Sequence, residues 1–213
     1  MVGDLVAEMG LRPRVFLATK VWTSGKEAGI AQMRRSAERL KSPVLDLIQI
    51  HNLLDWRTHL ATLRDMKANG QVRYIGITHY TTGSLPELAR ILETEPGIDF
   101  VQFGYSLATR DAETKLLPVA ASRRAATIVN QPFETGDMFR RVRGKPVPEW
   151  AVEFDCTSWA QLFLKYILAE PAVTAVIPAT ADPAHMADDL KAGFGRLPDA
   201  QQRQKIRQLW DSL

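Results

Sequence analysis

The sequence predicts an α/β fold built on a parallel sheet, a (β/α)8 TIM-type barrel that is incomplete, with about six of the eight strand–helix units. Apolar runs rich in β-branched and aromatic residues alternate along the chain with amphipathic stretches, a pattern typical of strands covered on both faces. Polar residues close most of these runs at the carboxyl side. The G-x-G-x-x-G fingerprint is absent, which favours a barrel over a doubly wound dinucleotide-binding sheet. We expect a single domain over residues 1–213.

The expected strands lie in the apolar runs at 15–22, 45–52, 72–80, 99–106, 126–133 and 172–180. Each run is almost continuously apolar, as a strand buried on both faces is. Residues 1–12 are interpreted as the tail of a helix that precedes the first strand.

Helix patterns fill the intervals between the runs. Apolar stripes at helical spacing are formed by Ile30, Met33, Ala37 and Leu40, by Leu60, Leu63 and Met66, by Leu85, Leu88 and Leu92, and by Ile206, Leu209 and Leu213. Gly70 predicts a carboxyl-terminal cap. Ser84 with Glu87 predicts a capping box, and Asp182 before Pro183 predicts an amino-terminal cap.

Composition excludes several classes of protein. No run approaches the roughly 18 apolar residues of a membrane helix, and the first ten residues hold no basic residue, unlike a signal peptide. A lone cysteine, Cys156, excludes a disulfide framework and a multi-cysteine zinc site. The four histidines show no metal-ligand spacing. The cytoplasm is the default compartment.

The net charge is +3, with one basic cluster at 140–145. No aromatic residue interleaves with that cluster, so we interpret it as a solvated loop and expect no nucleic-acid partner. His59 is interpreted as a surface or interface residue of a helix, and Cys156 as a packed, unreactive thiol. The sequence leaves the oligomeric state open.

The residues that close the runs are the candidate site. They are Lys20, His51, Thr78 with His79, Asn130 and Thr180. In a parallel barrel the carboxyl ends of the strands and the following loops form the active-site face. Strand ends of this kind therefore predict polar groups that converge on one site.

In this order, the segments "LATK", "IQIHN", "IGITHY", "VQFGY" and "VIPAT" resemble the aldo-keto reductases, and the resemblance covers the whole chain. It implies a barrel enzyme that transfers a hydride between a nicotinamide cofactor and a small-molecule aldehyde or ketone. Lys20 and His51 match the lysine and the histidine that flank the substrate carbonyl. A lysine there lowers the pKa of a tyrosine that donates the proton, and a histidine orients or polarises the carbonyl oxygen.

The resemblance also implies cofactor contacts. Thr78 and His79 match a pair that holds the nicotinamide amide, and Gln102 matches a glutamine that completes this contact. Asn130 stands where many members have a tyrosine that stacks on the ring. The stretch from Thr180 to Asp189 matches the adenosine-phosphate segment, at the amino terminus of a helix.

Two positions bear on the choice between NADP(H) and NAD(H). Ala179 replaces a lysine of the resembled family, and His185 stands where an arginine binds the 2′-phosphate. A protonated His185 can attract that phosphate, and the resemblance implies NADP(H) rather than NAD(H).

The tyrosine and the aspartate that serve the lysine in the resembled family match no residue of this chain. We therefore expect an amino-terminally truncated barrel that could itself be inactive. Two other classes stay open: a non-catalytic nicotinamide-nucleotide-binding module, and a barrel aldolase or isomerase in which Lys20 forms a Schiff base.

Overall fold

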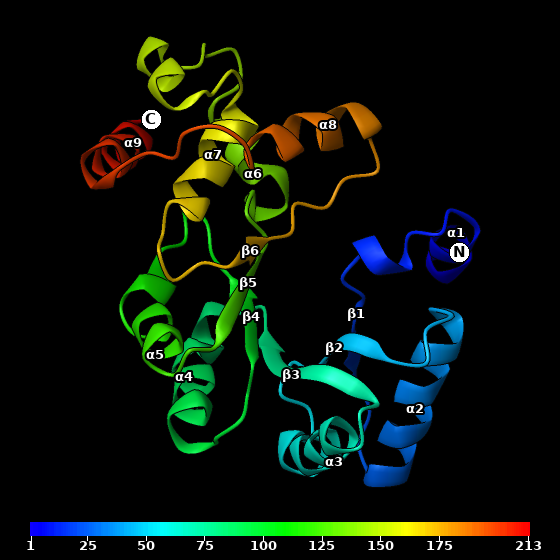
Figure 1. Ribbon diagram of the computed structural model, residues 1–213. Coiled ribbons are helices and arrows are strands. Elements are labelled where there is room, and N and C mark those ends of the chain that lie inside the picture. Colours follow the sequence, from blue (N-terminus) through cyan, green and yellow to red (C-terminus); the bar gives the residue numbers. More distant parts are fainter.

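The computed structural model describes residues 1–213 as a parallel sheet whose strands alternate with helices. The strands are β1 (Ala18–Val21), β2 (Leu45–His51), β3 (Val72–His79), β4 (Phe100–Gly104), β5 (Ala126–Asn130) and β6 (Ala175–Val176). Each strand pairs with the one before it, so the sheet order is β1-β2-β3-β4-β5-β6 (Figure 1). β6 does not pair with β1, and the sheet is open. The prediction of a parallel α/β fold with about six strand–helix units of a (β/α)8 barrel is confirmed.

The helices fill the expected intervals. They are α1 (Val2–Glu8), α2 (Lys26–Arg39), α3 (Trp56–Ala68), α4 (Leu85–Thr94), α5 (Leu116–Ser122), α6 (Asp137–Arg141), α7 (Trp159–Leu168), α8 (Pro183–Lys191) and α9 (Ala200–Ser212). Short 3-10 turns are η1 (Arg12–Arg14), η2 (Thr82–Ser84), η3 (Asp111–Glu113), η4 (Glu134–Gly136) and η5 (Glu149–Phe154). None of these helices is long and apolar enough to cross a membrane.

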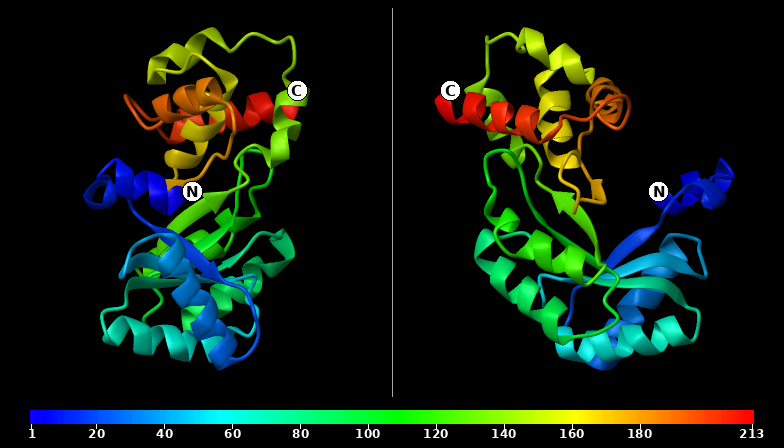
Figure 2. Two further views of the ribbon diagram at one scale, coloured as in Figure 1. Left: turned by 90° about the vertical axis from the view of Figure 1, so that its right-hand side faces the viewer. Right: turned by 60° about the vertical axis from the view of Figure 1, so that its left-hand side comes forward.

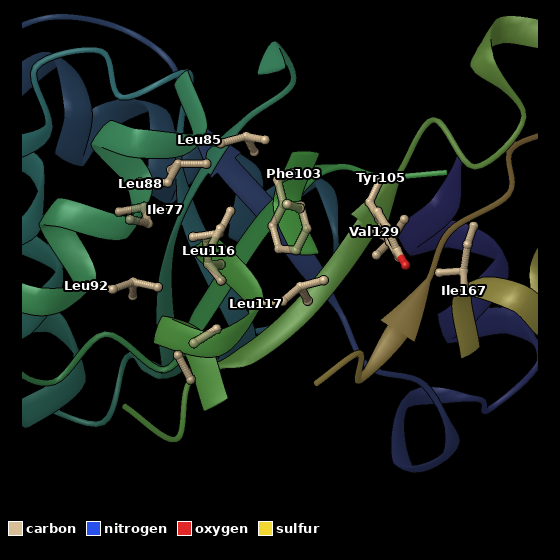
Figure 3. Close-up of a cluster of buried hydrophobic side chains, with 14 of the residues drawn as sticks. Ile77, Leu85, Leu88, Leu92, Phe103, Tyr105, Leu116, Leu117, Val129 and Ile167 are labelled. Carbon is tan, nitrogen blue, oxygen red and sulfur yellow. The ribbon is translucent and has the colours of Figure 1, made fainter. Parts of the chain in front are cut away.

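One face of the sheet packs against helices and forms the core. Its strand residues include Ile48, Ile50, Ile75, Ile77, Val101, Phe103 and Val129. Figure 3 shows leucines of α4 and α5, among them Leu88 and Leu116, gathered around Phe103. Burial of such a side chain contributes about 1.5–3 kcal/mol, so this cluster is the main source of stability for the sheet.

We call the opposite face of the sheet, which bears Lys20, Gln49, Thr78 and Gln102, the inner face. Near the amino ends of the strands an aromatic cluster covers it. The ring of Phe16 lies 6.1 Å from that of Tyr74 and 5.8 Å from that of Phe100. The polar side chains of the inner face lie closer to the carboxyl ends of the strands.

Helix ends agree with the sequence in two of three places. Gly70 follows α3 with φ +71°, the left-handed conformation expected of a carboxyl-terminal cap. The Asp182 side chain accepts a hydrogen bond from the backbone N–H of Ala184 at 2.8 Å and caps α8 as predicted. The capping box at Ser84 is wrong, because Glu87 instead pairs with Arg90 at 2.6 Å.

Two further expectations need correction. The last apolar run forms only the two-residue β6, because the chain turns away after Val176 and leaves Thr180 beyond the strand. His59 is wholly buried rather than at the surface. Its Nε2 lies 2.7 Å from the carbonyl oxygen of Thr23, so the ring ties α3 to the segment that leads into α2.

The helices form two groups. Figure 2 shows α7, α8 and α9 together at one end of the molecule, with α2 to α5 at the other. Lys165 of α7 is fully buried and donates hydrogen bonds to the carbonyl oxygens of Phe154 (2.7 Å), Phe194 (2.7 Å) and Arg196 (2.8 Å). The ammonium group therefore fixes α7 to the segments that flank it.

Candidate functional site

The strand register aligns candidate residues in two neighbouring rows of the inner face. Lys20 pairs with Gln49. One row further, His51 pairs with Thr78, and Thr78 pairs with Gln102. Paired residues of parallel strands point to the same face, on strands about 4.8 Å apart. The ladder thus gathers these side chains near the carboxyl ends of β1 to β4.

The surroundings of Lys20 and His51 disfavour their charged forms. Burial lowers the pKa of Lys20. Burial also lowers the pKa of His51, and the nearby charges of Lys20 and His79 lower it further. The ring of Trp22 meets that of His51 edge-on, 5.2 Å away. His51 is accordingly a neutral imidazole at pH 7, able to donate a hydrogen bond to a carbonyl oxygen.

Thr78 and Gln102 fit a planar amide ligand. They are only 2% and 5% exposed, yet neither side chain hydrogen-bonds to another part of the protein. Their polar atoms are not among the fully buried ones without a partner, so they remain accessible at the inner face. A hydroxyl and an amide on adjacent strands offer donors and acceptors together, which the carboxamide of nicotinamide would satisfy.

A cavity of ≈ 970 Å³ lies beyond the carboxyl ends of β5 and β6. Asn130, Thr180, His185 and Asp189 all line it, with residues of α7 on the same wall. Its size is at the upper end of the roughly 300–1,000 Å³ range of ligand pockets. The structure therefore brings together four of the residues predicted to bind the cofactor.

Gly104 connects this cavity with the inner face. It pairs with Asn130 and lies one row beyond Gln102. A Cβ atom at Gly104 would lie 3.0 Å from the carbonyl oxygen of Tyr80, 3.3 Å from Oε1 of Gln131 and 3.6 Å from Oδ1 of Asn130. That Oδ1 atom is buried without a hydrogen-bond partner. Glycine has no side chain, so these three oxygen atoms surround an open space. A ligand that carries N–H donors would suit this space.

The amino terminus of α8 forms the far wall of the cavity. Thr180 Oγ1 accepts a hydrogen bond from the backbone N–H of Asp182 at 3.1 Å. His185 is mostly exposed, with its Nε2 3.8 Å from the Asp182 carboxylate. Asp188 accepts from Ser158 at 2.5 Å and from Gln161 at 2.6 Å. Lys191 lies 3.9 Å from Asp188, so the carboxylates of Asp182, Asp188 and Asp189 around His185 are only partly balanced by cations.

His79 lies off the row of Thr78 and Gln102, although its charge reaches His51. It pairs with Phe103, whose side chain lies in the core, so strand alternation directs His79 to the face opposite Thr78. Its Nδ1 accepts a hydrogen bond from the backbone N–H of Thr81 at 3.2 Å. The structure does not place His79 in the row of Thr78 and Gln102.

Other residues lie outside the cavity. The cluster predicted as a solvated loop is only partly a loop, because Arg140 and Arg141 end α6. Its basic side chains are exposed and line no part of the cavity: Arg140, Arg141, Arg143 and Lys145. Cys156 is packed as predicted, and burial raises its pKa to about 12.

Sequence reasoning missed Gln49. It is 1% exposed, and its Nε2 atom is buried with no hydrogen-bond partner. The signal was present: Gln49 is a polar residue inside an apolar run, two positions before His51, and alternation places both on one face.

Comparison with known proteins gives a consistent result. The family model described as "Aldo/keto reductase family" matches residues 1–211. A glyoxal reductase of Bacillus subtilis (strain 168) is 30% identical over 115 residues, which are 52% of this chain and 42% of that protein. The aldo-keto reductase dtxS3 of Metarhizium robertsii (strain ARSEF 23 / ATCC MYA-3075) is 24% identical over 147 residues, 67% of this chain and 39% of that one. The matches thus span less than half the length of these curated relatives.

Solved structures share the fold. An aldo/keto reductase from Klebsiella pneumoniae, in complex with NADP and acetate, superposes with a TM-score of 0.79 at 23% identity. The match covers 98% of this chain and 74% of that one. The holo form of an aldo-keto reductase from Bacillus halodurans gives a TM-score of 0.76 at 23% identity, covering 98% and 75%.

Proposed function

The chain belongs to the aldo/keto reductase family, and from this premise we propose that it binds a reduced nicotinamide dinucleotide and reduces an aldehyde or ketone. The observation that carries the proposal is the pair Thr78 and Gln102, buried and unpartnered on adjacent strands beside His51. We take residues 1–213 as one reductase-like domain.

Lys20 and His51 have distinct roles in this proposal. His51, neutral at pH 7, donates a hydrogen bond to the carbonyl oxygen and so stabilises the negative charge that develops there. Lys20, one row closer to the amino ends of the strands, supplies a positive potential that assists proton delivery to the same oxygen. When bound, the dinucleotide supplies the hydride that adds to the carbonyl carbon.

The cofactor would lie along the rows of the inner face from Gln102 to Asn130 and from there into the cavity. Thr78 and Gln102 hold the carboxamide, and Asn130 offers an acceptor one row further. The wall of Thr180, His185 and Asp189 receives the adenosine end. We propose NADP(H) rather than NAD(H), with a protonated His185 attracting the 2′-phosphate; the NADP complex of the Klebsiella pneumoniae reductase supports this choice.

Turnover by this chain is expected to be slow, because its two buried tyrosines, Tyr105 and Tyr166, are held away from the role of proton donor. Tyr105 and Tyr166 donate their hydroxyls to Glu113 at 2.6 Å and 2.8 Å. Burial raises the pKa of both, that of Tyr166 to about 12. A positioned general acid is worth on the order of 10² to 10⁴ in rate.

Two measurements test the proposal. Fluorescence titration with NADPH and NADH should give saturable binding, and a panel of aldehydes should show slow consumption of the bound cofactor. Absence of saturable binding of either dinucleotide at millimolar concentration would contradict it.

One observation favours a second candidate. The lowered pKa of Lys20 is also what a Schiff-base amine requires, since only the neutral amine attacks a carbonyl. Borohydride treatment with a carbonyl substrate would then attach the substrate covalently to Lys20, and cofactor consumption without such trapping would exclude this reaction.

A further inference from the structure

The turn that follows β2 holds a leucine in an unfavourable backbone conformation. Asn52 and Leu53 have φ of +51° and +56°, and the backbone N–H of Leu54 donates to the carbonyl oxygen of His51 at 3.1 Å. Two consecutive positive φ values closed by such a hydrogen bond are the features of a type I′ turn. Asparagine is common at its first central position, and glycine at the second. Leu53 therefore occupies a position at which a Cβ atom is strained.

Packing of the Leu53 side chain compensates for this strain. The side chain is half-buried and packs against the hydrophobic core, whereas that of the next residue, Leu54, is 37% exposed. A strained conformation persists only where the surrounding structure determines it. Glycine would form the same turn without strain, but it would lack the contact with the core.

A second set of contacts fixes the far end of the same loop. Asp55 also has a positive φ, of +48°, and its Oδ2 accepts a hydrogen bond from the backbone N–H of Gly25 at 2.8 Å. Nε2 of His59 lies 2.7 Å from the carbonyl oxygen of Thr23. The loop after β2 is thus joined to the loop after β1, and the turn at Leu53 lies between this junction and His51.

His51 is the residue whose place depends on the turn. It is the last residue of β2, and its carbonyl oxygen is the acceptor that closes the turn. It pairs with Thr78, and its ring lies 5.2 Å from that of Trp22. The strand holds a terminal residue from one side only, so the segment that follows decides how firmly the side chain is placed.

We propose that Leu53 is a positioning residue for His51: its packed side chain keeps the left-handed turn, and the turn holds the imidazole on the row of Thr78. This inference rests on the proposed role of His51 as the donor to the substrate carbonyl. Displacement of a catalytic group by about 1 Å costs on the order of 100-fold in rate. Leu53 therefore serves catalysis through His51, without touching the substrate.

Three substitutions at this position separate packing from strain. Leu53→Ala removes the packing and keeps a Cβ atom, Leu53→Gly removes both, and Leu53→Met keeps the packing. We expect Leu53→Gly to unfold at a higher temperature than Leu53→Ala, because glycine adopts a positive φ without strain. At Leu54, whose φ is not positive, the order should be reversed, with the alanine variant more stable than the glycine variant.

Proton NMR of the full chain without ligand measures the placement of His51. Burial first, and then the charges of Lys20 and His79, lower the pKa of His51. Looser placement should therefore raise this pKa towards 6.5 in Leu53→Ala and Leu53→Gly. The chemical-shift change that the Trp22 ring imposes on the imidazole protons should decrease in the same two variants. Leu53→Met should keep both values of the wild type.

Kinetics give a second measurement. In Leu53→Ala and Leu53→Gly, kcat for an aldehyde should fall on the order of tenfold. The dissociation constant for NADPH should change less than about twofold, because the turn is not placed against the dinucleotide.

Leu209→Ala is the control for a general loss of stability. It trims a half-buried leucine of α9, which lies at the opposite end of the molecule from α2 and α3 (Figure 2). This variant should unfold at a lower temperature and leave both NMR values of His51 unchanged. The inference is overturned if Leu53→Ala and Leu53→Gly leave these values as in the wild type, or if Leu209→Ala changes them equally.

The NMR measurements need no dinucleotide, so the inference and the proposed function can fail separately. If neither NADPH nor NADH binds but the His51 values change with Leu53, the turn still places His51 and the proposed function fails. If a dinucleotide binds and is consumed but the His51 values do not change, Leu53 has no positioning role and the proposed function stands.

Discussion

Lys20 differs from a surface lysine because no carboxylate accompanies it. It makes no ion pair, and its half-buried position lowers its pKa. A cation of this kind is available to act on a substrate rather than to stabilise the fold, since a structural lysine ordinarily has acceptors, as Lys165 has.

We expect Lys20→Met to reduce kcat/KM for an aldehyde about 100-fold, because the charge that assists proton delivery is lost. The dissociation constant for NADPH should change less than about twofold, since we place Lys20 beside the carbonyl rather than the dinucleotide. Lys26→Met, at the exposed start of α2, is the matched control. A parallel loss of NADPH binding in Lys20→Met would show that the residue acts on the cofactor.

The titration of His51 provides a test that needs no turnover. Its pKa lies below the ordinary value of 6.5, through burial first and then the charges of Lys20 and His79. A nearby positive charge disfavours protonation, so Lys20→Met should raise the pKa of His51 towards 6.5 without restoring it fully. Proton NMR follows this, with the His51 signal assigned by His51→Gln. An unchanged pKa of His51 in Lys20→Met would show that the charge of Lys20 does not reach His51.

Much of the candidate site could be predicted from residue patterns. Alternation and strand order suffice to place Lys20, His51, Thr78 and Gln102 at neighbouring positions, because parallel strands carry their carboxyl ends to one edge. Alternation also predicts that the neighbours Thr78 and His79 face opposite sides of the sheet, so only one of them can share the row of Gln102. The partners of Asp188, Ser158 and Gln161, could not be foreseen, because they come from the start of α7, which lies about 30 residues earlier in the chain.

At the scale of elements, the contact between α2 and α3 leaves no room for a methyl group. A Cβ atom at Gly29 would lie 2.5 Å from Cε1 of His59. We expect Gly29→Ala to lower the free energy of unfolding by about 1–3 kcal/mol, because overpacking outweighs the roughly 1 kcal/mol gain in helix propensity. Urea denaturation measures this. The double variant with His59→Ala should recover part of the loss, and a purely additive double variant would place the strain elsewhere.

Glu113 joins three elements. It accepts hydrogen bonds from Tyr105 after β4 and Tyr166 of α7, and it pairs with Arg203 (2.9 Å) and Arg207 (3.2 Å) of α9. Burial alone would raise the pKa of Glu113, but these donors and charges lower it below its ordinary value of 4.5. Its ionised form is therefore what holds α9 in place.

We expect Glu113→Gln to destabilise the protein by about 1–3 kcal/mol at pH 7. Because the folded pKa of Glu113 is lowered, its contribution is present above pH 4.5 and is lost as pH falls through the folded value. The difference between wild type and variant should therefore shrink in acid, as chemical denaturation at several pH values would measure. Glu149→Gln, an exposed carboxylate, is the control. A pH-independent difference would rule out the charge as its source.

The elements themselves follow from local pattern more closely than their ends do. Strands β1 to β5 lie inside the predicted runs, because a run apolar on both faces is stable only between two layers. β6 is shorter than its run, since pairing to β5 ends at Val176. Ser84 fails as a capping box because Arg90 attracts the Glu87 carboxylate, and His59 is buried because Gly29 opens a space for its ring. The contact between Gly29 and His59 is tertiary and leaves no mark in local sequence, whereas the Glu87–Arg90 pair, three residues apart in α4, is local.

At the scale of the whole molecule, the two faces of the sheet have unlike surroundings. Helices α2 to α5 pack against one face, whereas the polar rows of the inner face lead to the cavity bounded by α7 and α8. The arrangement separates the part of the chain that stabilises from the part to which we assign chemistry. Substitutions in the two polar rows are therefore expected to affect ligand binding before stability.

The coincidence of strand order with chain order has a kinetic consequence. Every strand finds its partner in the unit synthesised just before it, so contacts are local and little loop-closure entropy opposes each addition. We expect the sheet to assemble vectorially on the ribosome, one strand–helix unit at a time, with α9 docking last through Glu113. Nascent chains arrested after successive units should gain protease resistance in steps. Protease resistance that arises only in the full-length chain would mean that the sheet folds only after α9 has been synthesised.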